Sequence, residues 1–453
     1  MVSDLLTEEL YDAGRSGLHW SIAPPSVDRC RAIVVTVGGF HHKLGALLRR
    51  ICEALPSMLR RDNADFAAAF ARAHDEASRA VRSFAVEGPR AHIADARSRL
   101  LLPHYIAPAA MESALAAVTA DSLLDFAAQL WSPPATLAGP APPPPPSPSY
   151  RCLVYGNVDA ASAAAMVRDA AATADAAFAR NVEAAVGGAA AGASGTASAA
   201  GSAASSWPAF AVPRALLPPP RSVVVVTKPH PNVNEVNAAV AITYLVDGVR
   251  TPRTMALASL LSMLLSHATF DTLRTKQQLG YIVASDTQVF ARTAVGITIV
   301  VQSSVASVAV LEARMDAFVA TVEEAVLAAV SDAELEERKA VLAARLLEPP
   351  KTQGAEFAGL DEAVSRLVRV GVMAEFHRDE ATAAAVRAVT KASLVQFARD
   401  TLDAASPRLR KVVVRVYARN AGGGGGGGAG SGGVASASSD VALALLGGGP
   451  TAS

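Results

Sequence analysis

One polar segment follows a predominantly apolar stretch in the second half of the chain, and its side chains could bind a ligand. It reads Phe270-Asp-Thr-Leu-Arg-Thr-Lys-Gln-Gln-Leu-Gly-Tyr-Ile-Val283 and crosses Gly280 from a predicted helix into a predicted strand. Arg274 carries five N–H donors and Tyr281 carries a phenol. Helix ends and strand starts are places where a scaffold holds side chains rigidly. Arg274 and Tyr281 are therefore our candidate binding residues.

Arg274 also has a simpler interpretation. Asp271 lies three residues before it, a spacing that brings two side chains together on a helix. Surface ion pairs of this kind are common and contribute little. The spacing alone leaves both interpretations open.

The other residues that could do chemistry are poorly spaced for it. No two of the nine histidines are four residues apart, and neither H-E-x-x-H nor H-x-x-E-H occurs. His41 and His42 are adjacent, so their side chains point apart, and we interpret them as part of a solvated loop. G-x-S-x-G, G-x-x-x-x-G-K-[ST] and G-x-G-x-x-G are also missing. We therefore predict no catalytic residue, no metal ligand and no cofactor in this chain.

Composition narrows the class of protein. The 453 residues are 51% hydrophobic and 18% charged, which is enough for a large core. Lys and Arg number 41, as do Asp and Glu, which argues against a nucleic-acid partner bound through phosphate neutralisation. No apolar run reaches the roughly 20 residues of a membrane helix, and we expect Met255–Leu265 to be a buried helix. Three cysteines without C-x-x-C spacing and an acidic start without a signal sequence favour the cytoplasm.

Low-complexity segments divide the chain. Pro140–Pro148 is a proline run, Ala185–Ser206 contains little besides Ala, Gly and Ser, and Ala421–Gly433 is nearly pure glycine. We therefore predict two folded blocks, residues 1–185 with a Pro-rich insertion at 133–149, and residues 207–419. Residues 186–206 are a predicted linker, and 420–453 a predicted disordered tail whose one short apolar patch is Val441–Leu446.

Hydrophobic periodicity predicts strands and helices interleaved in both blocks. In the first, the predicted strands are Arg31–Val37 and Arg151–Tyr155, and the predicted helices Lys43–Leu59 and Ala160–Arg180. In the second, the predicted strands are Ser222–Thr227, Val236–Leu245, Tyr281–Ser285, Val295–Val301 and Lys411–Tyr417. Its predicted helices are Thr254–Gln278, Leu311–Val326, Ser331–Leu347 with a Ser331/Glu334 capping box, and Ala392–Leu402. This order indicates an α+β fold, a two-layer sandwich with a mixed sheet.

The sequence L-R-T-K-Q-Q-L-G-Y-I-V at 273–283 resembles a characteristic stretch in the C-terminal half of the insulin-degrading enzyme family. This family contains inverzincin metallopeptidases of the M16 type, related to insulysin, nardilysin and pitrilysin. Supporting similarities cover most of residues 1–185 and 207–419; they are Glu8–Ile22, Val35–Leu48, Tyr155–Asn157, Phe376–Asp379 and Ala404–Arg419.

The resemblance implies a fold and a role. Members have four homologous α+β domains in two halves around a chamber, with zinc on an H-x-x-E-H helix of the first domain. This chain resembles the third and fourth domains. The resemblance therefore implies two homologous two-layer sandwiches, the first lacking its opening strands. Arg274 and Tyr281 match positions that hold the substrate backbone. Zinc would then belong to an N-terminal catalytic half, joined in cis or in trans, and the ligand would be a peptide.

Three functional hypotheses follow. The first is a substrate-cradling, non-catalytic half of an insulysin-like zinc metalloendopeptidase, inactive by itself. The second is a free-standing inactive subunit or binding module that complements a separate catalytic chain. The third is a truncated gene product, in which a missing strand would expose a sheet edge and favour aggregation.

Overall fold

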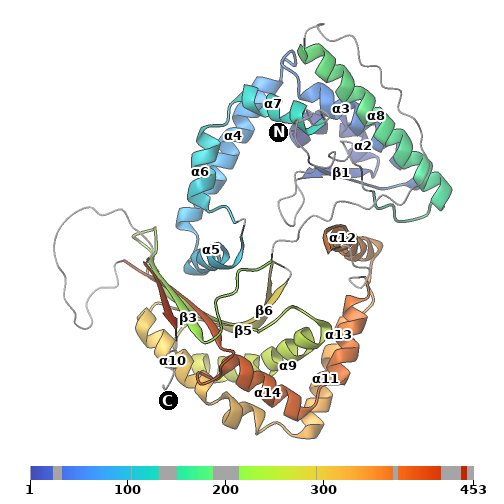
Figure 1. The fold of residues 1–453 in the computed structure, drawn as a ribbon. Helices are drawn as coiled ribbons and strands as arrows, with labels where there is room; N and C mark the ends of the chain where they lie inside the picture. The colour runs from blue at the N-terminus through green and yellow to red at the C-terminus, as the bar shows by residue number, and fades with distance from the viewer. Residues whose placement is uncertain are drawn as a thin grey trace, which may run out of the picture. The chain divides into compact units, whose positions relative to one another are not determined.

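The chain contains two compact units (Figure 1). The computed structural model describes residues 2–23, 33–103, 105–131, 150, 152–186, 214–291, 293–370, 376–419 and 440–445. Unit 1 comprises Met1–Val81, Ala109–Ala209 and Lys351–Val364, and unit 2 comprises Arg82–Pro108, Phe210–Pro350 and Ser365–Ser453. Residues Arg82–Pro108 lie within the first predicted block by sequence and pack with unit 2 in space.

Unit 1 is mainly helical. Its strands β1 (His19–Ala23) and β2 (Val34–Gly38) form an antiparallel pair in which His19 lies opposite Gly38. Its helices are α1 (Val2–Glu9), α2 (Tyr11–Arg15), α3 (His41–Met58), α4 (Phe66–Ser83), α6 (Pro108–Ala116), α7 (Ala120–Trp131) and α8 (Ala160–Val186), together with α12 (Gln353–Val370) as far as Val364. Strand β2 corresponds to the strand predicted at Arg31–Val37, of which Arg31 and Ala32 lie outside the described residues.

The core of unit 1 forms around α3. The predicted helical periodicity is confirmed, since Leu47, Ile51 and Leu55 are buried along one face of this helix. Leu55 packs against Ala174 and Phe178 of α8. The strand predicted at Arg151–Tyr155 is wrong, because residues 152–155 adopt no regular structure. A strand needs a hydrogen-bonding neighbour, and β1 and β2 pair only with each other among the described strands.

Unit 2 is built on a six-stranded mixed sheet in the order β5-β6-β4-β7-β3-β8. The strands are β3 (Ser222–Pro229), β4 (Ala238–Leu245), β5 (Ile282–Phe290), β6 (Ala294–Ser303), β7 (Arg410–Tyr417) and β8 (Asp440–Leu445). Strands β3 and β7 are parallel and every other neighbouring pair is antiparallel, as expected for a mixed sheet. The predicted pairing of the two strands that follow Gly280 is confirmed by β5 and β6.

Helices cover both faces of this sheet (Figure 1). On one face lie α9 (Pro252–Thr269), α10 (Val308–Ala320), α11 (Asp332–Leu346), α13 (Arg378–Arg387) and α14 (Lys391–Leu402). On the other lies α5 (Pro89–Leu101), which contributes Ile93, Ala96 and Leu101. Strand β4 alternates between the two cores, with Ile242 on the first and Ala241 on the second. This explains why β4 is a continuous apolar run instead of an alternating one.

Local signals fix several element ends in unit 2. The predicted capping box is confirmed at the start of α11, where Ser331 Oγ accepts from the Glu334 amide at 3.2 Å and Glu334 Oε2 accepts from the Ser331 amide at 3.3 Å. The C-terminal tail, expected to be disordered throughout, contains strand β8, which pairs antiparallel with β3. The tail's one apolar patch supplies this strand, and it covers an edge of β3 that would otherwise be unpaired.

One long apolar helix belongs to the core of unit 2. Pro252–Lys276 is long and apolar enough to span a membrane by length and composition, but 56% of its most apolar window is buried inside the protein. Leu260, Leu261 and Leu265 are fully buried against the sheet. The expectation of a buried helix at Met255–Leu265 is therefore confirmed.

Candidate functional site

The candidate site lies where α9 ends and β5 begins. A capping box between Thr251 and Thr254 and a proline at the first helical position start α9. The helix continues into a π-helical turn, η2 (Phe270–Lys276), whose Leu273 is fully buried. The predicted helix of residues 254–278 is thus observed as two segments. A π-turn changes which side chains share a face, and such turns are frequent at functional sites.

The connection from η2 to β5 is held tightly against β6. A Cβ atom at Gly280 would lie 2.0 Å from the carbonyl oxygen of Gln302, so only glycine fits. Gln278 has a positive φ of 51°, which turns the chain, and Leu279 is buried. The turn at Gln278 and the close packing of Gly280 therefore fix the position of Tyr281, the next residue.

Arg274 contacts two aromatic rings. Its guanidinium carbon is 4.7 Å from the ring centroid of Phe270 and 4.9 Å from that of Tyr281. Tyr281 is 81% exposed and Phe270 44% exposed, so this stack is open to solvent. Each cation–π contact at an exposed position is worth about 0.5–1 kcal/mol. The structure thus brings the two predicted residues together and adds Phe270 to them.

The ion pair proposed as the simpler interpretation of Arg274 forms elsewhere. The carboxylate of Asp271 is 2.7 Å from the ammonium of Lys276, and Arg274 contacts the two rings instead. A guanidinium stacked on aromatic faces keeps its N–H groups in its own plane, where they remain free to donate. These donors and the Tyr281 hydroxyl can bind carbonyl oxygens or a carboxylate.

Phe270 is the residue that sequence reasoning missed. Phe270 and Arg274 are four residues apart, a spacing that places side chains together on a helix. The aromatic residue was part of the segment that stood out, yet the spacing by itself does not distinguish a stacking partner from an ordinary buried phenylalanine.

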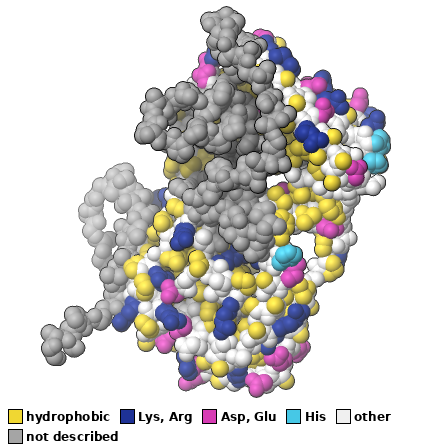
Figure 2. All heavy atoms as spheres, turned by 45° about the vertical axis from the view of Figure 1, so that its right-hand side comes forward, with side chains coloured by type: hydrophobic (Ala, Val, Ile, Leu, Met, Phe, Trp, Pro, Cys, Tyr) yellow, Lys and Arg dark blue, Asp and Glu magenta, His cyan; other side chains and the backbone are white. Residues whose placement is uncertain are grey.

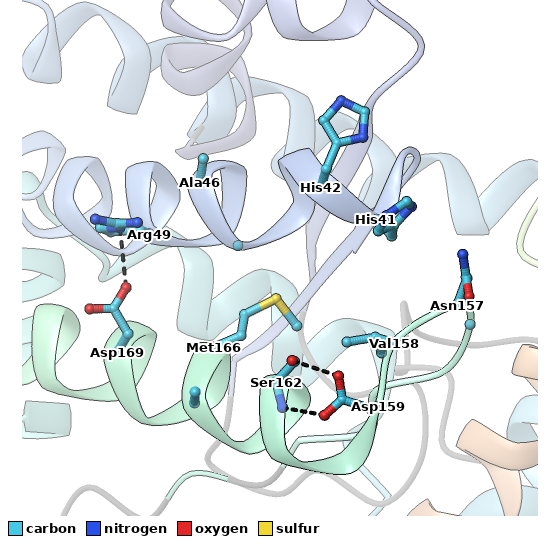
Figure 3. A pocket seen from close by; sticks show the side chains of 13 residues that line it. His41, His42, Ala46, Arg49, Asn157, Val158, Asp159, Ser162, Met166 and Asp169 are labelled. Carbon is cyan, nitrogen blue, oxygen red and sulfur yellow. Dashed lines mark hydrogen bonds and ion pairs between the residues drawn. The ribbon is translucent and has the colours of Figure 1, made fainter.

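His41 and His42 lie at the start of α3, not in a loop, so that prediction is wrong. They line a hollow of about 1030 Å³ in unit 1, between α3 and the start of α8 (Figure 3). Arg49 and Asp169 form an ion pair across it at 3.2 Å. The ring centroids of the two histidines are 5.5 Å apart and the planes cross at 78°.

Zinc has no fitting set of ligands in the part of the chain that the structure describes. No group of three or more His, Cys, Asp or Glu side chains there is placed to hold a metal ion. The rings of His41 and His42 lie close to each other, but no carboxylate among the described residues joins them in a set of three metal ligands. We therefore derive no chemical step through a metal in this chain.

A buried polar cluster attaches α5 to the sheet of unit 2. Asp95 is 2% exposed, and its carboxylate lies 2.9 Å from Arg99 and 3.4 Å from Lys228 of β3. Tyr105 donates a hydrogen bond to the same carboxylate at 3.1 Å. Burial lowers the pKa of Lys228, and the negative charge of Asp95 opposes that shift. Within this cluster the negative charge of Asp95 is paired with Arg99 and Lys228, which is typical of a structural role.

Two family models match separate segments of this chain. Residues 1–114 match the family described as the middle or third domain of peptidase M16. Residues 260–360, which include Arg274 and Tyr281, match the C-terminal lobe domain 4 of PqqF-like PQQ synthases. The two matched segments support assignment of the chain to the peptidase M16 family. Both matched domains, the third and the fourth, lie in the C-terminal half of such proteins.

Among curated M16 relatives, human insulin-degrading enzyme is 34% identical over 189 residues, which cover 41% of this chain and 18% of that protein. A nardilysin-like protein of Arabidopsis thaliana is 28% identical over 188 residues, again 41% of this chain and 18% of the relative. The matched part therefore spans less than a fifth of these relatives.

Solved structures show the same fold. Pitrilysin superposes with a TM-score of 0.68 at 19% identity, over 92% of this chain and 38% of the pitrilysin chain. A protease from Helicobacter pylori superposes with a TM-score of 0.55 at 12% identity, over 90% of this chain and 84% of the other. The α+β fold with helices on a mixed sheet is thereby confirmed as that of M16 domains.

Proposed function

We propose that this chain is the substrate-cradling, non-catalytic half of an insulysin-like zinc metalloendopeptidase. In this proposal Arg274 and Tyr281 hold the backbone of a peptide, and an N-terminal half, in cis or in trans, supplies the zinc. The cytoplasm remains the location expected from the sequence.

One observation carries the proposal. Arg274 contacts the rings of Phe270 and Tyr281 on a solvent-open surface, while the nearby acidic residue Asp271 is paired with Lys276. A fixed guanidinium without a carboxylate can donate to a peptide carbonyl without first breaking an ion pair. A fixed donor loses less conformational entropy on binding than a mobile one.

The charge distribution agrees with a peptide ligand. Basic and acidic side chains are interspersed on the face shown in Figure 2, and the totals are equal for the whole chain. A nucleic-acid partner would call for a continuous basic surface. Neutral hydrogen-bond donors and one stacked cation suit a peptide main chain better.

Peptide binding by the full chain tests the proposal. We expect a terminally blocked, fluorescein-labelled extended peptide to bind the unaltered protein in an anisotropy titration. Arg274→Ala should weaken binding by about 10-fold or more, the value of a hydrogen bond to a charged group, 1.5–3 kcal/mol. Arg274→Lys should recover only part of it, because lysine lacks the planar fork.

The matched control is Arg338→Ala, which removes an exposed arginine from α11. It should leave the affinity within about twofold of the unaltered protein, since the screened charge alone contributes little. Equal losses in the two variants would mean that Arg274 acts only through net charge, and would refute the proposal.

A further inference from the structure

Three large apolar side chains are exposed beyond one end of the unit 2 sheet. They are Tyr281 at 81%, Val305 at 78% and Val236 at 66% exposure, and we call them the apolar row. Single exposed hydrophobic residues are ordinary on a protein surface, whereas contiguous ones mark binding sites. Whether these three are contiguous is decided by the register of the strands.

The register brings the segments that carry the three residues to the same end of the sheet. Strand β4 begins with Ala238 opposite Ser303 of β6, and β5 begins with Ile282 opposite Gln302. Val236 lies two residues before β4, Val305 two residues after β6, and Tyr281 one residue before β5. Since neighbouring strands are about 4.8 Å apart, the ends of β5, β6 and β4 that carry the row span about 10 Å.

Each turn that carries a member of the row is fixed by hydrogen bonds. The buried hydroxyl of Ser303 accepts from the amides of Val305 at 3.0 Å and Ala306 at 2.9 Å. Beside Val236, the carboxylate of Glu235 accepts from the Asn237 amide at 2.8 Å and from its side chain at 2.6 Å.

Tyr281 is held by its contact with Arg274 and by the close approach of Gly280 to Gln302. The apolar row is thus ordered before any ligand arrives. Exposed apolar groups that are held rigidly gain on binding without a large loss of conformational entropy.

We propose that the apolar row extends the Arg274 site and binds apolar side chains of an extended peptide. This inference rests on the proposed function, because the row begins at Tyr281, the residue that stacks on Arg274. In an extended peptide, side chains on one face repeat every 6.6–6.8 Å or so. A row about 10 Å long therefore accommodates two of them, while Arg274 reaches the main chain.

The probe is a terminally blocked, fluorescein-labelled nonapeptide with leucine at alternate positions, titrated against the full chain. A second probe carries serine in place of every leucine. Val236→Ser and Val305→Ser should each weaken binding of the leucine probe by about 5- to 10-fold, from the loss of one buried valine contact. The serine probe should bind weakly and be insensitive to both substitutions.

Val249→Ser is the matched control. Val249 is 58% exposed and follows the opposite end of β4, so it loses a similar apolar surface away from the row. Its affinity for the leucine probe should stay within twofold of the unaltered protein. Circular dichroism should show all three serine variants folded, because the side chains are exposed.

The outcomes separate the two ideas. If Arg274→Ala weakens binding and the row variants behave like Val249→Ser, the row is refuted and the proposed function stands. If the row variants weaken binding and Arg274→Ala does not, the row stands and the role of Arg274 is refuted. Equal losses at Val249, no binding of the leucine probe, or a dimer that dissociates on Val236→Ser would each overturn the apolar row.

Discussion

His92 should make unit 2 less stable in acid. This side chain is 1% exposed between the rings of Phe84, at 4.6 Å, and His230, at 4.5 Å, and neither of its nitrogens has a hydrogen-bond partner. Burial is the main cause that lowers its pKa from 6.5 to about 4; Lys228 and His230 act in the same sense, while Asp95 and the backbone of Glu87 act in the opposite sense. The folded state therefore holds the neutral form.

The direction and size of the effect follow from that shift. Between pH 6.5 and pH 4 the unfolded chain binds the proton and the folded chain does not, so stability falls as the pH falls through this window. A shift from 6.5 to about 4 corresponds to about 3 kcal/mol in full, of which about 2.5 kcal/mol is lost between pH 7.5 and pH 4.5.

His92→Phe removes the titrating group and keeps a planar ring. Because the histidine nitrogens have no partner, no hydrogen bond is lost, and the stability at pH 7.5 should change by only about 1 kcal/mol. Urea unfolding followed by circular dichroism at the two pH values measures the difference. The unaltered protein should lose about 2.5 kcal/mol more than the variant on acidification.

His230→Phe is the control. His230 contacts the carbonyl oxygen of Glu87 at 2.8 Å and accepts from the Asn232 amide at 3.1 Å. Losing these bonds should cost about 1–3 kcal/mol already at pH 7.5. If His92→Phe leaves the pH dependence of stability unchanged, the reasoning about the buried, neutral His92 is wrong.

Three further predictions concern the site, the thiols and the whole protein. Gly280→Ala should destabilise unit 2 by about 2–3 kcal/mol, because its Cβ would meet the Gln302 carbonyl, whereas Gly359→Ala on α12 meets nothing within 4 Å and should be neutral or stabilising; urea unfolding distinguishes them. Burial, with smaller effects of Cys152 and Glu53, raises the pKa of Cys52 to about 11, so at pH 8 Cys52 should react with iodoacetamide about 100-fold more slowly than a thiol of ordinary pKa, as measured by mass spectrometry; comparable rates would contradict this. An antibody against Leu311–Leu347 should detect an endogenous protein more than twice 46.4 kDa if both halves are one polypeptide, and a band near 46.4 kDa would instead support the free-standing subunit.

Much of unit 2 could be predicted from local sequence. The four valines of β3, the Ser331/Glu334 capping box and the glycine before β5 each act within a few residues, and each was located correctly. The predicted strand at Arg151–Tyr155 failed for the opposite reason. A strand is completed by a partner that lies elsewhere in the chain, and local residues do not reveal whether that partner exists.

Two elements of unit 2 that local sequence did not predict, α5 and β8, depend on contacts with residues far away in the chain. Helix α5 packs on a sheet made of residues more than a hundred positions away, through Ile93, Ala96 and Leu101. Strand β8 pairs with β3 across a Gly-rich stretch of low complexity, where composition indicated only disorder. Composition measures whether a segment can form a core of its own, not whether it can complete the core or sheet of another.

The candidate site shows how local and tertiary signals combine. Sequence alone identified Arg274 and Tyr281, seven residues apart across a glycine, a separation that no regular helix or strand would bring into contact. They meet because η2 is a π-turn and because Gly280 lets the chain pass against Gln302 before Tyr281 emerges. A larger residue at position 280 should therefore separate the Tyr281 ring from Arg274 without touching either side chain. In that case Gly280→Ala would lower peptide affinity as well as stability, a combined loss that distinguishes a positioning role from simple core packing.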